Sequence, residues 1–170
     1  KVRAAIGRAS DFVGPEYDVM GDLVIQPALK GETANLVGRV DMPHTFTYIP
    51  DFGRALAVLG TRDEALGRAW IAPSAAPVTQ QQLVDLFAAE IGQPIKTRAA
   101  GALIMRVLGL FNPSMRETVE MMYEWNHPYV VDSSLFERTF GIQPTPLAQA
   151  VRETVAWYRQ QAAVPQPARA

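Results

Sequence analysis

The stretch that decides the fold lies near the start of the sequence and reads Arg8-Ala9-Ser10-Asp11-Phe12-Val13-Gly14-Pro15. An apolar run from Val2 to Ile6 precedes it, and the Gly-Pro pair ends it. This order is typical of a buried strand that ends at the edge of an α/β sheet, where ligands bind beyond the carboxyl ends of the strands. We therefore expect a buried strand over Val2–Arg8, followed by a loop that faces a ligand.

The composition is that of an ordinary globular chain. The chain has 170 residues, of which 48% are hydrophobic, enough for one domain or one lobe of a larger protein. Its formal net charge of −1 does not favour nucleic acid, which normally requires a basic face. The longest apolar stretch, 102–111, contains Arg106 and is too short to span a bilayer. We therefore expect neither a nucleic-acid nor a membrane partner.

The sequence contains no cysteine, which excludes disulfide bonds and thiolate metal sites. No spacing of histidine and carboxylate on a helix supports a metal site either, so we expect none. The lack of cysteine and of a recognisable signal peptide fits a cytoplasmic protein. Because the sequence opens at Lys1 and enters a predicted strand at once, we expect it to be the C-terminal portion of a longer polypeptide.

Strands and helices alternate along the predicted chain. After the first strand we expect strands over 34–40, 44–49, 69–72, 94–98 and 129–131, and helices over 17–29, 50–59, 79–91, 102–110, 112–125, 134–140 and from 145 onward. Thr79 and Gln82 have the spacing of a capping box, and Gly92 is placed to end that helix. Asp51 is expected to cap the helix that begins at Pro50, and Gly60 to end it.

Four stretches carry a resemblance to a known family. They are Arg8–Pro15, Phe46–Phe52, Gly67–Thr79 and Asp132–Tyr158. In this order they are similar to the C-terminal part of an extended short-chain dehydrogenase/reductase, of the NAD(P)-dependent epimerase/dehydratase family. The resemblance implies an α/β fold: the C-terminal part of a Rossmann-like NAD(P)-binding fold with the small α/β substrate-binding lobe. Residues 1–162 would form this substrate-binding portion with the last Rossmann strands, and 163–170 a disordered tail.

Two motifs of that family are absent from this sequence, namely its glycine-rich phosphate loop and its catalytic Tyr-x-x-x-Lys. Four residues before Lys30 and Lys96 stand Gln26 and Gly92, and nothing precedes Lys1. Because both motifs lie upstream of the opening strand in the family, we expect the N-terminal cofactor-binding half to be missing. The chain alone is then not expected to be active, since it holds no catalytic residue. A homodimer formed through the missing half is compatible with the resemblance.

The resemblance implies NAD or NADP as cofactor and a small-molecule substrate. It places Ala9, Ser10 and Phe12 on the cofactor side of the first strand end. It places substrate contacts at Asp11, Val13, His44, Tyr48, His127 and Tyr129.

Each of these residues also has a purely structural interpretation. Asp11 can form a turn ahead of Gly-Pro, and as an anion it would repel a phosphate where the family often has an asparagine. His44 aligns with a position often held by a diphosphate-binding arginine, but a histidine cannot make that bidentate contact and is equally consistent with a strand-end residue. His127 and Tyr129 fit either a binding loop or a tight proline turn.

We therefore expect the substrate-binding part of an epimerase, dehydratase or reductase that acts by hydride transfer on a sugar nucleotide or another hydroxyl or keto substrate. A Tyr/Lys pair outside the chain would move the proton. The alternatives are a non-catalytic regulator that senses the dinucleotide on the same scaffold, and a stand-alone α/β binding module.

Overall fold

The computed structural model describes residues 3–101 and 119–163. Its elements in chain order are β1 (Ile6–Arg8), β2 (Asp11–Val13), α1 (Asp18–Met20), the π-helix η1 (Gly21–Ile25), α2 (Gln26–Leu29), β3 (Ala34–Val37), β4 (Pro43–His44), β5 (Phe46–Tyr48), α3 (Ile49–Thr61), the 3-10 helix η2 (Asp63–Ala65), β6 (Ala69–Ile71), β7 (Val78–Thr79), α4 (Gln80–Ile91), β8 (Thr97–Ala100), α7 (Tyr123–Asn126), α8 (Ser134–Phe140) and α9 (Leu147–Ala163). The helix expected over 102–110 and most of the one expected over 112–125 lie outside the described residues.

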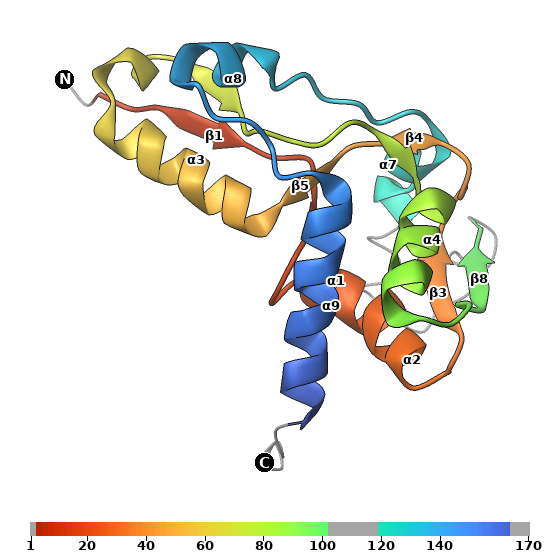
Figure 1. Cartoon of the computed structure of the whole chain (residues 1–170). Helices are drawn as coiled ribbons and strands as arrows, with labels where there is room; N and C mark the ends of the chain where they lie inside the picture. The colour runs from red at the N-terminus through yellow and green to blue at the C-terminus, as the bar shows by residue number, and fades with distance from the viewer. Residues whose placement is uncertain (1–2, 102–118, 164–170) are drawn as a thin grey trace, which may run out of the picture.

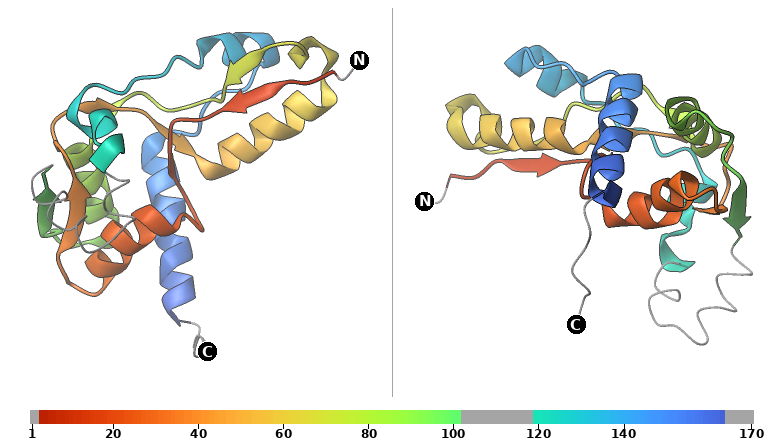
Figure 2. Two further views of the ribbon diagram at one scale, coloured as in Figure 1. Left: turned by 180° about the vertical axis from the view of Figure 1, so that it is seen from behind. Right: turned by 60° about the horizontal axis from the view of Figure 1, so that its bottom comes forward.

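Parallel pairing between distant strands organises the chain. β1 pairs with β6, β2 with β5 and β3 with β8, each in parallel, while β4 and β7 pair antiparallel. Figure 1 shows α3 and α8 beside the β1–β6 pair at one end of the molecule, and α2, α4 and α9 around the other end. Figure 2 shows the same arrangement from behind. The α/β class is confirmed.

The two ends correspond to two hydrophobic cores. The smaller core joins α3, β6 and α8 through Ala55, Leu59, Ala65, Trp70, Ala72 and Phe136. The larger core joins the β2–β5 pair to α4 and α9, with Val13, Phe46, Phe87, Val151 and Val155 among its buried members. The β2–β5 pair and the residues next to it connect the two cores, and the candidate site lies there.

Several local predictions are confirmed. Thr79 accepts a hydrogen bond from the Gln82 backbone N–H at 3.1 Å, while the Gln82 side chain accepts one from the Thr79 N–H at 2.8 Å, which is the predicted capping box. Gly92 and Gly141 adopt left-handed conformations and end α4 and α8. The expected helix over 17–29 is a helical run that contains the π-helix η1, in which the Gln26 N–H donates to the Gly21 carbonyl.

The predictions for α3 are wrong in two respects. The helix begins at Ile49, so Asp51 lies inside its first turn, and no side chain caps the helix. Asp51 instead accepts hydrogen bonds from the Thr145 N–H and the Thr145 hydroxyl, both at 2.7 Å, and so fixes the segment before α9. The helix also continues through Gly60 to Thr61, because nothing at Gly60 requires a left-handed turn.

The expectation of a fully buried first strand is also wrong. The described strand is shorter, Ile6–Arg8. Ile6 is 54% exposed because successive side chains of a strand alternate between faces and α3 covers the face on which Gly7 lies. β8 lies at 97–100 rather than 94–98. Of the tail expected over 163–170, Ala163 is the last residue of α9 and the rest lies outside the described residues.

Candidate functional site

The site is built where the chain passes from β1 into β2 and meets β4 and β5. Asp11 stands opposite Phe46 in the parallel β2–β5 pair, and His44 lies two residues before Phe46. A third segment joins them, since the Thr45 N–H donates to the Tyr129 carbonyl and the Tyr129 N–H to the Pro43 carbonyl, both at 2.9 Å. Three of the predicted substrate contacts, Asp11, His44 and Tyr129, are thereby brought together.

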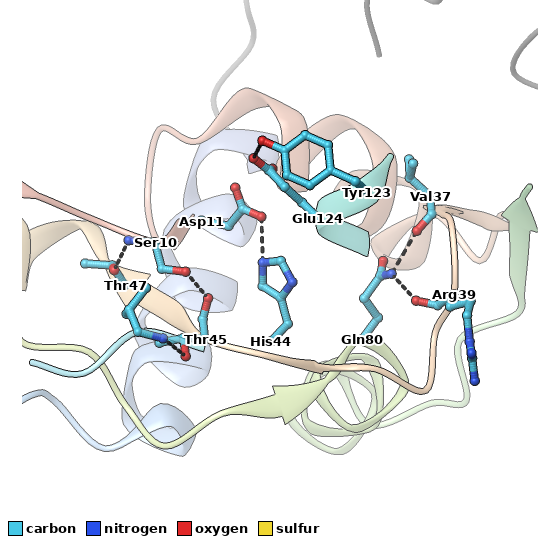
Figure 3. A network of polar contacts seen from close by, with 11 residues as sticks. Ser10, Asp11, Val37, Arg39, His44, Thr45, Thr47, Gln80, Tyr123 and Glu124 are labelled. Atoms are coloured by element: carbon cyan, nitrogen blue, oxygen red, sulfur yellow. Dashed lines mark hydrogen bonds and ion pairs between the residues drawn. The ribbon is translucent and has the colours of Figure 1, made fainter. Parts of the chain in front are cut away.

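Asp11 and His44 form a direct pair. The Nε2 atom of His44 lies 2.7 Å from Oδ2 of Asp11, and the two side chains are 2% and 28% exposed. Figure 3 shows the imidazole pointing toward the carboxylate. The histidine is therefore the buried member of the pair, and the carboxylate is the member that reaches the surface.

Aromatic rings enclose the His44 imidazole. The Trp125 ring stacks on it at 4.2 Å with an interplanar angle of 5°, and the rings of Phe46 and Tyr129 lie at 4.9 and 5.1 Å. Trp125 comes from α7, so the stack fixes that helix against β4. Sequence spacing alone could not pair Trp125 with His44, because the two residues lie far apart in the chain.

Two carboxylates give this region a negative potential. Burial is the main cause that raises the pKa of Tyr129, and the charges of Glu124 and Asp11 raise it further. Burial likewise raises the pKa of Tyr17, again with a contribution from Asp11. Both phenols therefore remain neutral hydrogen-bond donors at physiological pH.

A chain of buried hydroxyl groups fixes the loop before Asp11. The Ser10 N–H donates to the Thr47 hydroxyl at 3.0 Å, and the Ser10 hydroxyl donates to the Thr45 carbonyl at 2.6 Å. The Thr47 hydroxyl lies 2.8 Å from that of Ser74, whose N–H donates to the Ser133 hydroxyl at 3.3 Å. Sequence reasoning did not find Thr47, Ser74 or Ser133, because polar residues at strand ends are common and their contacts here span 27 to 59 residues.

The remaining predicted site residues are more dispersed. Val13 is fully buried in the larger core, and the Phe12 ring packs against Tyr17 and Phe52 at 6.0 and 5.3 Å. Ala9 is half-buried beside Ser10. Tyr48 is buried, and its hydroxyl donates to Glu153 of α9 at 2.5 Å, while burial and that bond raise its pKa. His127 is exposed where α7 ends.

The described residues contain no group of three or more histidine and acidic side chains able to hold a metal ion. Within the same ranges no helix is long and apolar enough to cross a bilayer. What the site offers chemically is a partly exposed carboxylate, held in place by a buried imidazole, with two neutral phenols nearby. Such a group accepts hydrogen bonds from hydroxyl or amine donors.

The chain has the fold of Rossmann-like epimerases and dehydratases of known structure, although its sequence identity to them is low. No protein-family model and no curated protein matches the sequence. Solved structures do match it along nearly its whole length. The chain spans about half the length of these structures.

Three examples show the extent of the likeness. The dTDP-glucose 4,6-dehydratase of Bacillus anthracis, in complex with NAD, is 18% identical with a TM-score of 0.66, over 91% of this chain and 44% of that one. The UDP-glucose 4-epimerase of Thermotoga maritima, with UDP-glucose, gives 15% and 0.69 over 95% and 47%. The structure of RMD from Pseudomonas aeruginosa, complexed with NADPH, gives 16% and 0.63 over 91% and 47%. At these identities the likeness shows the fold.

Proposed function

We propose that this chain is the substrate-binding part of an NAD(P)-dependent epimerase, dehydratase or reductase. The observation that carries the proposal is the match of more than nine-tenths of the chain to such enzymes, which themselves are about twice as long. Two of those structures are complexes with NAD and with NADPH, and we propose NAD or NADP as the cofactor of this protein. The reaction is hydride transfer between the nicotinamide and a carbon that bears a hydroxyl or keto group.

In this proposal the edge formed by β1, β2 and β5 separates cofactor from substrate. Ala9, Ser10 and Phe12 face the nicotinamide side, and the buried hydroxyl chain supports it by keeping Ser10 in place. Because the Ser10 hydroxyl and its backbone N–H are both bonded within the protein and the residue is buried, we assign Ser10 the role of fixing the loop that faces the cofactor. No residue of this chain is assigned the proton transfer.

The substrate side is formed by Asp11, His44 and Tyr129, with His127 as a surface residue beyond α7. Val13 can contribute only through its backbone, since its side chain is fully buried. Tyr48 supports the site indirectly, because its hydroxyl donates a hydrogen bond to Glu153. The proposal therefore assigns direct substrate contact to Asp11 first.

The test uses the full-length protein. The purified protein is supplied with NAD or NADP and a panel of sugars, nucleotide sugars, alcohols and ketones. Both the absorbance of reduced nicotinamide and the conversion of substrate to product by NMR are followed, because an epimerase or a dehydratase regenerates its oxidised cofactor in each turnover. We expect turnover that falls in Asp11→Ala and His127→Ala, while Asp85→Ala on the exposed face of α4 leaves it unchanged. Cofactor binding without turnover of any substrate would instead favour a dinucleotide sensor, and unchanged turnover in both site variants would refute the site.

A further inference from the structure

We infer that Asp11 selects the substrate by charge: it binds a hydroxyl group of a phosphate-free substrate and excludes phosphate-bearing ones. This inference rests on the proposed function for the presence of a substrate at this edge. It goes further by naming the substrate class, an uncharged polyhydroxylated molecule rather than a nucleotide sugar or a sugar phosphate.

The first step is that His44 is not available to an anionic ligand. Its Nε2 atom is bonded to Asp11, and its side chain is 2% exposed beneath the rings of Trp125 and Tyr129. A phosphate would need the imidazole as a donor, and reaching it would mean breaking the pair and the stack together. The pair therefore presents only a hydrogen-bond acceptor to the surface.

The second step is that no arginine or lysine among the described residues forms an ion pair with the carboxylate, whose basic partner is the buried His44. Within residues 3–101 and 119–163 the arginine ion pairs are made with Asp41, Asp51, Asp63 and Glu90, and none with Asp11. Glu124 adds a second negative charge, and both charges act on the Tyr129 phenol. Like charges at close range oppose binding of a phosphate, whereas a carboxylate accepts strongly from a hydroxyl donor.

The third step is that one of the two carboxylate oxygens remains for the ligand. Oδ2 is bonded to His44, and the side chain is 28% exposed. The buried imidazole thus acts as a positioning group that keeps the carboxylate in one orientation. The neutral phenol of Tyr129, whose ring lies 5.1 Å from that of His44, can itself donate to a substrate oxygen.

The change Asp11→Asn isolates the charge. Asparagine has nearly the same shape, its carbonyl can still accept from His44, and its amide adds two donors. We expect the variant to lose affinity for the neutral ligand and to gain affinity for its phosphorylated counterpart. Asp85→Asn removes the same charge from the exposed face of α4 and is the matched control.

The experiment measures ligand binding to the full-length protein by saturation-transfer difference NMR. The probes are glucose, galactose and mannose, each with its 1-phosphate, together with inorganic phosphate. In the unmodified chain we expect at least one neutral sugar to bind, and its 1-phosphate to bind at least about tenfold more weakly. In Asp11→Asn we expect this ratio to fall by about tenfold or to reverse, and in Asp85→Asn to stay the same.

Three results would overturn the inference: a sugar phosphate that binds the unmodified chain more tightly than its neutral partner, an unchanged ratio in Asp11→Asn, or no binding by any neutral probe. These outcomes do not depend on hydride transfer. Turnover of a nucleotide sugar by the full-length protein would support the proposed function and refute this inference. Binding of a neutral sugar without any cofactor-linked turnover would support this inference and contradict the proposed function.

Discussion

The substitution Gly38→Ala tests whether the aromatic stack behind the site is held where the structure places it. Gly38 follows β3 in a left-handed conformation, with φ of +68°. A Cβ added there would lie 2.7 Å from Cβ of Trp125 and 3.2 Å from Oδ1 of Asn126. The first contact is close to the Trp125 backbone, so α7 must shift and the Trp125 ring must move on His44.

The size of the effect follows from two separate costs. An alanine in the left-handed region costs about 1–2 kcal/mol. Overpacking against a well-placed neighbour adds about 1–3 kcal/mol. Gly31 has nearly the same φ, +73°, with no atom within 4 Å of an added Cβ, so Gly31→Ala carries the first cost without the second. We therefore expect Gly38→Ala to be less stable than Gly31→Ala by about 1–3 kcal/mol.

Urea unfolding followed by far-ultraviolet circular dichroism gives the two free energies of unfolding. NMR of the indole N–H groups reports the position of Trp125, because the chain has three tryptophans and each gives one signal. We expect the Trp125 signal to move in Gly38→Ala, and those of Trp70 and Trp157 to stay. Equal destabilisation of both variants with an unmoved Trp125 signal would refute the packing between β3 and α7.

Two further substitutions test the contacts between α9 and the rest of the chain. Asp51→Ala removes a buried acceptor of two hydrogen bonds from Thr145, so urea unfolding should show that the free energy of unfolding falls by about 3–5 kcal/mol. The control is Asp63→Ala at an exposed ion pair, which should lower it by less than about 1 kcal/mol. Equal losses in the two variants would contradict the role of Asp51. Burial and the bond to Glu153 raise the pKa of Tyr48 above its ordinary value of about 10. The folded state therefore favours the neutral phenol, and the stability that this phenol contributes is fully present below about pH 10 and is lost as the pH rises above it. The urea midpoint of Tyr48→Phe should therefore fall less steeply above that pH, and an unchanged slope would show that the phenol titrates alike in the folded and unfolded states.

Local chemistry accounts for the elements that sequence could predict. The capping box of Thr79 and Gln82 and the glycine after α4 act within one or two turns, so their spacing alone identifies them. Asp51 has the same local pattern and was assigned the wrong role, because its partner Thr145 is 94 residues away. An aspartate that caps a helix and one that accepts a long-range hydrogen bond look alike in sequence. The fold determines which N–H or hydroxyl group donates to the carboxylate.

The same limit applies to the candidate site, where it changes the chemistry. Taken separately, Asp11 is an anion that repels phosphate and His44 is a weak substitute for an arginine that binds it. The parallel pairing of β2 with β5 brings the two within 2.7 Å of each other, and the imidazole is then a partner of the carboxylate rather than a donor to the ligand. Since the carboxylate is the member of the pair that reaches the surface, the pair as a whole offers a ligand a hydrogen-bond acceptor. In sequence, Asp11 and His44 seemed to offer opposite charges to a ligand. In the structure they form one acceptor, and the charge of Asp11 is therefore the property to change first.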